Sequence, residues 1–347
     1  MRAGRRLRRA LAPALLLAGV LVLAAPGTAT LQSATDIAVT ARAIPRFDPN
    51  PAAPVRFGGL EYVGGFSYSS PSPWLMGISA IRLLKGGRFL AVSDTGLWFA
   101  GHLDRDAAGR PVGISQARLA PILDPGGQPY RRKSDADAEG LAIGPEGEAL
   151  VSFEVNHRIA AYADAAAPFG AKPRFLPLPI PRKELRSNQG LETIATAPRG
   201  TPLAGRSIVV AERSLDADGN LLAGILGEGG GAFAVRRDEA WSATDGVFLP
   251  DGDFLLLERR FQGLTRVGMR IRRIEGRAIR PGALVDGPVL MEADLSKEID
   301  NMEGIDAYRA ADGSTRLVLV SDDNGSFLQR NLLLEFKLIE PGPAASN

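Results

Sequence analysis

A short pattern, glycine followed by an aliphatic residue and then by strand-forming segments that end near an acid, occurs five times along this chain. The five copies begin at Met76-Gly77-Ile78, Glu139-Gly140-Leu141, Gln189-Gly190-Leu191, Asp245-Gly246-Val247 and Glu303-Gly304-Ile305. A strand-rich repeat with a period of roughly 50–60 residues is typical of a β-propeller. Because a propeller brings the same end of every inner strand to one central channel, acids far apart in the sequence would meet there.

We therefore predict an all-β chain, a β-propeller with four-stranded antiparallel blades. The fourth copy shows the expected hairpin most clearly, with a Pro250-Asp251-Gly252 turn between two apolar segments. Segment 60–68 precedes the first copy and is expected to join the C-terminal blade, a ring closure that hides both sheet edges. Five copies are visible, and the longer interval between Trp98 and Ser134 has room for another. We predict six blades, with five as the alternative.

The N-terminus has the pattern of an export signal. Five arginines within the first nine residues precede an apolar stretch from Leu11 to Ala25, and small residues up to Ala29 suit cleavage. We expect a cleaved signal peptide over residues 1–29 and a periplasmic or secreted bacterial protein, with an uncleaved membrane anchor as the alternative. The general secretory route is favoured over twin-arginine export. Residues 30–56 are expected to be an extended linker, 57–340 a single propeller domain and 341–347 a tail.

Charge and cysteine content narrow the partners. Removing the five signal arginines from 41 basic residues leaves 36 against 39 acidic residues, a net charge near −3. This balance gives no support for nucleic-acid binding. The chain has no cysteine, which excludes thiolate chemistry and Cys-ligated zinc. We expect a monomer that acts on a small anionic ligand and has no integral membrane association after signal cleavage.

The acids of the repeat are the candidate functional residues. Glu139, Asp245 and Glu303 directly precede the repeated glycine, and Glu192 lies two residues after it. Converging carboxylates repel one another, and a bound divalent cation relieves that repulsion. We therefore predict Glu139, Glu192, Asp245 and Glu303 as metal ligands, with Ca²⁺ favoured over Mg²⁺ or Mn²⁺ because all the ligands are oxygens. Glu139, Glu192 and Glu303 are the candidate catalytic residues. The alternative is that acids beside glycine only form turns.

A second set of acids ends the second strand of each copy: Asp94, Glu154, Glu212, Glu258, and Asp322 with Asp323. These acids form either inter-blade ion pairs or part of the site. Arg213 and Arg259, which follow two of them, are candidate clamps for an anionic substrate. Asn188 and His157 are further candidates for substrate binding, with a turn or solvent histidine as the alternative for His157.

Missing motifs limit the mechanism. The chain has no G-x-S-x-G elbow, no phosphate-binding loop and no H-E-x-x-H motif, and its only histidines are His102 and His157. Hydrolysis would therefore use metal-assisted attack by water with a carboxylate as base.

Four segments of the chain resemble the phytase-like family of exported bacterial proteins, also called the esterase-like-activity-of-phytase family. They are Asp135-Ala136-Asp137-Ala138-Glu139-Gly140-Leu141, Asn188-Gln189-Gly190-Leu191-Glu192, Asp300-Asn301-Met302-Glu303-Gly304-Ile305 and Leu319-Val320-Ser321-Asp322-Asp323-Asn324. The resemblance extends from about Gly58 to Leu338, although the first copy has no acid before Gly77. It implies a β-propeller and a hydrolase of phosphoester or carboxylester bonds. A more distant similarity to gluconolactonase-like propellers, which place Glu at a central metal, supports the metal by analogy.

Together these patterns favour an exported ester or phosphoester hydrolase with a carboxylate cluster at the channel mouth. Two alternatives stay open at this point. One is a non-catalytic propeller that binds a ligand or protein, and the other is lactonase-type hydrolysis. All three would share the same scaffold and the same carboxylates.

Overall fold

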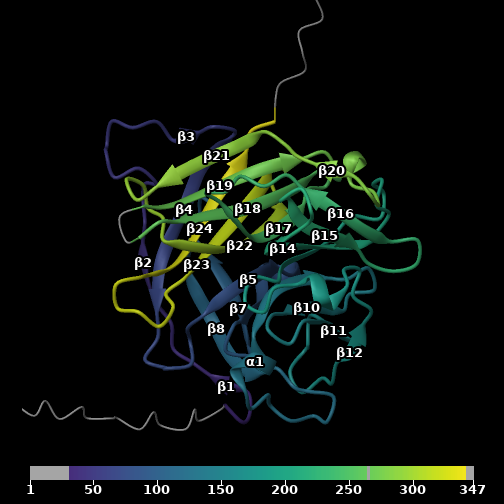
Figure 1. Cartoon of the computed structure of the whole chain (residues 1–347). Helices are drawn as coiled ribbons and strands as arrows, with labels where there is room; N and C mark the ends of the chain where they lie inside the picture. The colour runs from purple at the N-terminus through teal and green to yellow at the C-terminus, as the bar shows by residue number, and fades with distance from the viewer. Residues whose placement is uncertain (1–30, 264–265, 341–347) are drawn as a thin grey trace, which may run out of the picture. The chain divides into compact units, whose positions relative to one another are not determined.

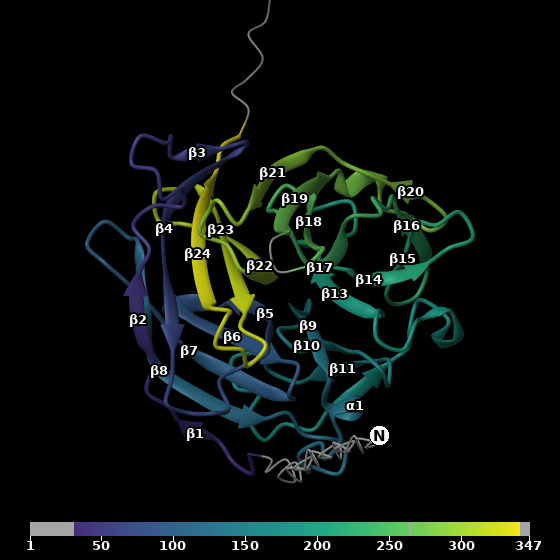
Figure 2. The ribbon, with the colours of Figure 1, turned by 60° about the vertical axis from the view of Figure 1, so that its left-hand side comes forward.

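The computed structural model describes residues 31–263 and 266–340, in which five β-sheets form the five blades of a β-propeller (Figures 1 and 2). The predicted all-β propeller is confirmed. The predicted signal peptide and tail, 1–29 and 341–347, lie outside the described residues.

Each blade begins with an inner strand and continues outward. Blade 1 is β5 (Ile78–Leu83), β6 (Arg88–Ser93), β7 (Leu97–Arg105) and β8 (Pro111–Pro121), with the short β1 (Thr35–Asp36) on β8. Blade 2 is β9 (Ala138–Ile143), β10 (Ala149–Phe153), β11 (Arg158–Tyr162) and β12 (Arg174–Leu176), preceded by the one-turn helix α1 (Lys133–Ala136). Blade 3 is β13 (Leu191–Thr196), β14 (Ser207–Leu215), β15 (Leu221–Ile225) and β16 (Gly231–Val235), with β20 (Leu284–Val285) parallel to β16.

Blade 4 is β17 (Ser242–Phe248), β18 (Phe254–Phe261), β19 (Val267–Ile274) and β21 (Val289–Asp294). Blade 5 is β22 (Asn301–Arg309), β23 (Thr315–Asp322), β24 (Asn331–Leu338) and β4 (Leu60–Ser69), with β2 (Thr40–Ala43) and β3 (Arg56–Phe57) on β4. Single turns of 3₁₀ helix cover Lys85–Gly87, Arg182–Glu184 and Gly276–Ala278. The inner strands contact one another in the cyclic order β5, β9, β13, β17, β22, and Figure 2 shows them around the centre.

The N-terminal strand closes the ring, as predicted. β4 pairs antiparallel with β24, so blade 5 joins residues from the two ends of the described chain. Residues 31–56, expected to be an extended linker, also contribute strands: β1 pairs with β8 of blade 1, and β2 pairs with β4 of blade 5. These short strands cover edges that would otherwise expose unpaired backbone groups.

The preference for six blades is corrected to five. The interval between Trp98 and Ser134, in which we placed a sixth blade, supplies most of β7 and all of β8. These strands are nine and eleven residues long, and they complete blade 1. A pair of long outer strands uses as much chain as several short ones, which is why length alone was misleading.

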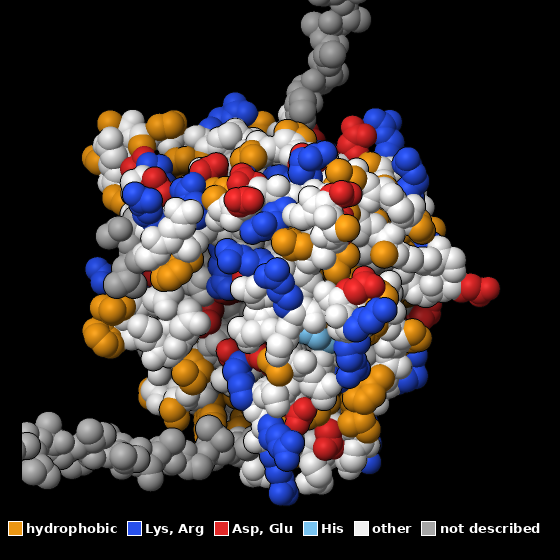
Figure 3. Space-filling view, viewed as in Figure 1, with side chains coloured by type: hydrophobic (Ala, Val, Ile, Leu, Met, Phe, Trp, Pro, Cys, Tyr) orange, Lys and Arg blue, Asp and Glu red, His pale blue; other side chains and the backbone are white. Residues whose placement is uncertain are grey.

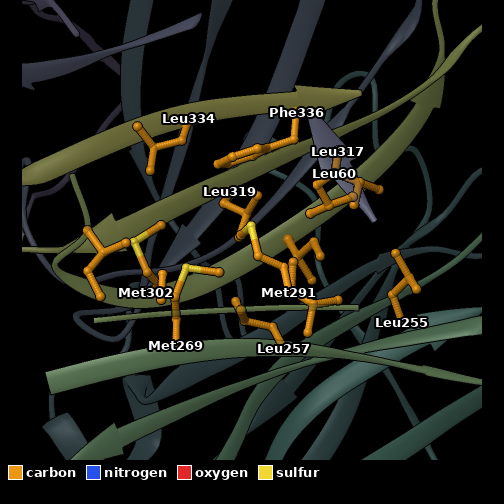
Figure 4. Close-up of a cluster of buried hydrophobic side chains, with 14 of the residues drawn as sticks. Leu60, Leu255, Leu257, Met269, Met291, Met302, Leu317, Leu319, Leu334 and Phe336 are labelled. Atoms are coloured by element: carbon orange, nitrogen blue, oxygen red, sulfur yellow. The ribbon is translucent and has the colours of Figure 1, made fainter. Parts of the chain in front are cut away.

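Apolar side chains fill the spaces between blades and hold the inner strands in place. Between blades 4 and 5, Leu257 and Met269 face Leu319 and Phe336, and all four are fully buried (Figure 4). Burying a side chain of this size stabilises a fold by about 1.5–3 kcal/mol. The angles between the blades, which define the channel, are therefore stabilised by hydrophobic packing.

Every inner strand carries a β-bulge in its pairing with the second strand of its blade. The skipped residues are Ser79, Glu139, Glu192, Thr244 and Glu303. A bulge re-aims the extra side chain and bends the strand. The second strand adds one more equivalent position in each blade, just after the residue that pairs beside the bulge: Asp94, Glu154, Glu212, Arg259 and Asp322. We call these two sets the bulge ring and the outer ring.

Arg82 of β5 blocks the channel axis. Its buried guanidinium donates to both carboxylate oxygens of Asp245, each at 2.9 Å. It also donates to backbone carbonyls of four inner strands, those of Ile81, Ile194, Gly246 and Ile305. One side chain thus ties together blades 1, 3, 4 and 5.

Candidate metal and substrate site

A cavity of about 470 Å³ lies at the end of the channel where the bulges are. It is lined by Ser79, Asp94, Lys133, Ser134, Asp137, Glu139, Glu154, Val155, Asn188, Glu192, Glu212, Arg259, Glu303, Asp322 and Asn324. Eight of these residues are acids and two are basic, a formal charge of −6 if all are ionised. In the space-filling view, acidic side chains are recessed near the middle of the face, with Lys and Arg side chains around them (Figure 3).

The two rings explain this lining. All five members of the outer ring reach the cavity, and so does every member of the bulge ring except Thr244. Because the bulges occur at equivalent places in the five blades, their side chains converge although the residues are far apart in the sequence.

The structure brings Glu139, Glu192 and Glu303 together in this cavity, with the predicted substrate-binding residues Asn188 and Arg259. It places Asp245, a predicted metal ligand, elsewhere. Asp245 follows the bulge residue Thr244, and a shift of one position along a strand reverses the direction of the side chain. Its carboxylate is fully buried, pairs with Arg82 and accepts the Ile305 N–H at 3.0 Å.

Arg213 and His157, two other predicted substrate-binding residues, also lie outside the lining of the cavity. The Nε of Arg213 donates to the Ser242 hydroxyl at 2.7 Å. His157 is buried beside Gly190, and its Nε2 lies 2.9 Å from the Arg186 carbonyl. Burial lowers the pKa of His157, which favours the neutral ring with Nε2 as the donor.

Sequence reasoning left the role of most outer-ring acids open and did not select Asp137 or Lys133. Four acids of the second set line the cavity: Asp94, Glu154, Glu212 and Asp322. The exceptions are Asp323, which accepts a hydrogen bond from Asn331, and Glu258, which is buried between Arg270 and Arg272 at 2.7 Å from each. Arg259, the next residue, occupies the ring position instead. If the copies are aligned by the bulge residue and not by the glycine, Arg259 and not Glu258 falls at the outer-ring position.

Two groups of three carboxylates lie close enough to bind cations. Asp137, Glu139 and Glu154 form one group, and Glu154, Glu192 and Glu212 form the other. Within each group one oxygen from every residue lies within 4.8 Å of the others. Since Ca²⁺ binds oxygens at about 2.3–2.6 Å, one ion can contact all three members of a group.

The carboxyl groups of the cavity are poorly stabilised as anions. Burial, then the neighbouring Asp137, raises the pKa of Glu139 well above its usual range, and burial, then Glu139, does the same to the pKa of Glu192. Glu192 is only 8% exposed, and among the described residues its carboxylate has no hydrogen bond or ion pair; its interaction with Arg259 acts at longer range. Burial also raises the pKa of Glu154 to about 7. A bound cation would remove this electrostatic cost, so the residues fit a metal ion.

Two basic side chains border the acids on different sides. The Lys133 ammonium lies 2.8 Å from Asp94 and 2.5 Å from Asp137. Arg259 pairs with Glu303 and lies 3.6 Å from Glu212. Burial outweighs Arg259 at Glu303, whose pKa is raised to about 7. Arg259 thus places a fixed cation beside a carboxyl group that titrates near neutral pH.

Fold and cavity together define the class, a five-bladed β-propeller with a carboxylate-lined site at one end of its channel. The chain belongs to the Phytase-like family, described as "Esterase-like activity of phytase", whose model matches residues 73–325. No curated protein matches the chain by sequence. In the part of the chain that the structure describes, no helix is long and apolar enough to span a membrane.

Several solved structures are similar to the chain. An endo-arabinase from Bacteroides thetaiotaomicron is 10% identical, with a TM-score of 0.46 over 79% of this chain and 97% of its own. The PQQ domain of a pyranose dehydrogenase from Coprinopsis cinerea is 10% identical, with a TM-score of 0.41 over 88% and 97%. A calcium-binding regucalcin from Agrobacterium tumefaciens is 13% identical, with a TM-score of 0.38 over 84% and 93%.

Proposed function

We propose that this protein is a Ca²⁺-dependent hydrolase of phosphoester or carboxylester bonds. The observation that carries the proposal is the buried, unpartnered carboxylate of Glu192 within a cavity that also holds a cationic clamp, Arg259. A carboxylate in this state favours a cation as partner. The family to which the chain belongs is consistent with ester hydrolysis.

The carboxylates of the two groups would hold the cation. When bound, Ca²⁺ would polarise the ester and favour ionisation of a water molecule. Glu303 acts as the general base, because a base with a pKa of about 7 is half deprotonated at neutral pH and still accepts a proton readily. Glu139 and Glu192, predicted to be catalytic, serve as ion ligands in this scheme.

Arg259 binds the anionic part of the substrate. Its guanidinium already contacts Glu303 and donates to Asn301 at 2.9 Å, so it is oriented before substrate arrives. The predicted signal peptide supports action outside the cytoplasm. Modules that work there bind Ca²⁺ with dissociation constants of roughly 10⁻⁴–10⁻³ M, so even a weak site would be occupied.

Hydrolysis of p-nitrophenyl phosphate and p-nitrophenyl acetate by the purified protein tests the proposal. We expect activity that EDTA abolishes and Ca²⁺ restores. Glu303→Gln should lower kcat by about 10²-fold or more, the usual contribution of a general base. Arg259→Met should raise KM and, because Arg259 lowers the pKa of Glu303, should also move the pH dependence of kcat to higher pH. Glu184→Gln, in the exposed 3₁₀ turn Arg182–Glu184, should change nothing.

Activity that is unaffected by both EDTA and Glu303→Gln would refute the mechanism. Ca²⁺ binding without turnover of either ester would instead identify a binding propeller.

A further inference from the structure

We propose that the cavity holds two cations, not one, and that the Glu154 carboxylate bridges them; this inference rests on the cation site of the proposed function. Glu154 is the one residue common to both carboxylate groups. Asp137 and Glu139 approach it from blade 2, and Glu192 and Glu212 approach it from blade 3. We call these the Asp137 position and the Glu192 position.

The spacing of the ligands favours two ions. Oxygens bound to a single Ca²⁺ at about 2.3–2.6 Å lie within roughly 5 Å of one another. Each group of three meets this limit separately, whereas among the described residues no group within 4.8 Å contains all five acids. Glu154 is also fixed between the positions, because the Gly190 N–H donates to one of its oxygens.

The charge of the cluster also favours two ions. Five carboxylates surround the two positions, and the basic groups that contact them lie at the edges, Lys133 on Asp137 and Arg259 near Glu212. Glu192, which is 8% exposed, has neither contact. One divalent cation would leave most of this buried negative charge uncompensated, and two would nearly neutralise it.

The two positions should differ in affinity. Lys133 lies 2.5 Å from Asp137 with its side chain 56% exposed, so a cation at the Asp137 position must displace it or bind beside it. At the Glu192 position the neighbouring cation is Arg259, which lies 3.6 Å from Glu212 but pairs directly with Glu303, so it opposes a bound ion less than Lys133 does. We expect tighter binding at the Glu192 position, and Lys133→Gln should strengthen the weaker site by about thirtyfold, the effect of removing one positive charge at about 4 Å from a divalent cation in water.

A bridged pair also selects a substrate class. Two ions about 3.5–4 Å apart can hold two oxygens of one phosphoryl group while stabilising the attacking and leaving oxygens. A carboxylester carbonyl offers a single oxygen for this purpose. With Arg259 beside the Glu192 position, the site suits a phosphoester better than a carboxylester.

Ion counting on the purified, EDTA-treated protein tests the pair. Calorimetric titration with Ca²⁺ should give two ions per chain in the wild type and in the Glu184→Gln control. Asp137→Asn and Glu192→Gln should each retain one ion, the weaker and the tighter site being lost respectively, and Glu154→Gln should lose both. With Mn²⁺, electron paramagnetic resonance should show a spin-coupled pair in the wild type and uncoupled ions in the two single-site variants.

One ion in the wild type, or the loss of the same ion in Asp137→Asn and Glu192→Gln, would overturn the inference. These two variants decide the matter even if Glu154→Gln does not fold. One bound ion with Ca²⁺-dependent hydrolysis would overturn the pair and leave the proposed hydrolase standing. No bound ion and no hydrolysis would overturn both. A carboxylester preference with two ions would refute the substrate assignment.

Discussion

At the scale of the residue, the ion pair between Arg82 and Asp245 shows how strongly one position along a strand decides a role. Asp245 has the repeat pattern of a ligand, but it lies one residue past the bulge and serves the structure instead. Both partners are almost entirely buried. Such a pair stabilises little in itself, whereas loss of one partner leaves an uncompensated buried charge.

Arg82→Met should therefore lower the free energy of unfolding by about 3–5 kcal/mol. Replacing both partners, Arg82→Met with Asp245→Leu, should recover part of that loss, because the Asp245 carboxylate is then gone and only the nearby Asp306 still loses the charge of Arg82. Urea unfolding followed by circular dichroism measures both effects. The control Arg277→Met removes an exposed ion pair with Glu275 and should leave stability unchanged. A double variant less stable than Arg82→Met would contradict this account.

At the scale of the element, hairpins and ring closure could be predicted from sequence, while the alignment of the bulges could not. Glycine directly follows the bulge only in blades 2 and 5, where there is no room for a side chain. A Cβ on Gly140 would lie 2.4 Å from the Glu192 carbonyl oxygen. At the equivalent place blade 3 has Thr193 and blade 4 has Asp245. Aligning the copies by their glycine therefore selected the bulge residues of blades 2 and 5, Glu139 and Glu303. In the other three blades the same alignment selected a position that is not the bulge.

Ring closure by β4 should matter far more than the strands that precede it. A chain that starts at residue 44 loses β1, β2 and the partly buried side chains of Ile37 and Val39, at a cost of about 3 kcal/mol. A chain that starts at residue 70 also loses β4, exposes the edge of β24 and should aggregate. Size-exclusion chromatography and urea unfolding distinguish the two. A folded monomer from residue 70 onward would show that closure is dispensable.

At the scale of the whole molecule, the cavity makes stability depend on pH and on calcium together. Burial raises the pKa of Glu154, Glu303 and Asp322 to about 7 in the folded protein. In the unfolded chain such groups titrate near 4. Between these values the folded state retains protons that the unfolded chain has lost, so the free energy of unfolding falls as pH rises.

Without Ca²⁺, the melting temperature should therefore fall between pH 5 and pH 8. One unit of pKa shift corresponds to about 1.4 kcal/mol, so the loss should reach several kcal/mol. Millimolar Ca²⁺ should reduce the fall, because the cation replaces the proton of Glu154, whereas Glu303 and Asp322 lie outside the two ligand groups. Scanning calorimetry at both pH values, with EDTA or Ca²⁺, measures this. Glu154→Gln should show a smaller fall and little response to Ca²⁺; an equal calcium response at pH 5 and pH 8 would contradict the argument.

Arg82 also limits the passage of molecules along the channel. Because its guanidinium spans the inner strands of four blades, the cavity lining ends above it and the space beyond, which Arg82 itself lines, shares no residue with the cavity. Among the described residues, Arg82 therefore closes the channel on the inner side of the cavity. In a hydrolase built this way, both products must leave by the route that the next substrate needs to enter. Product and substrate then compete for the cavity, and product release limits the rate of turnover when product accumulates.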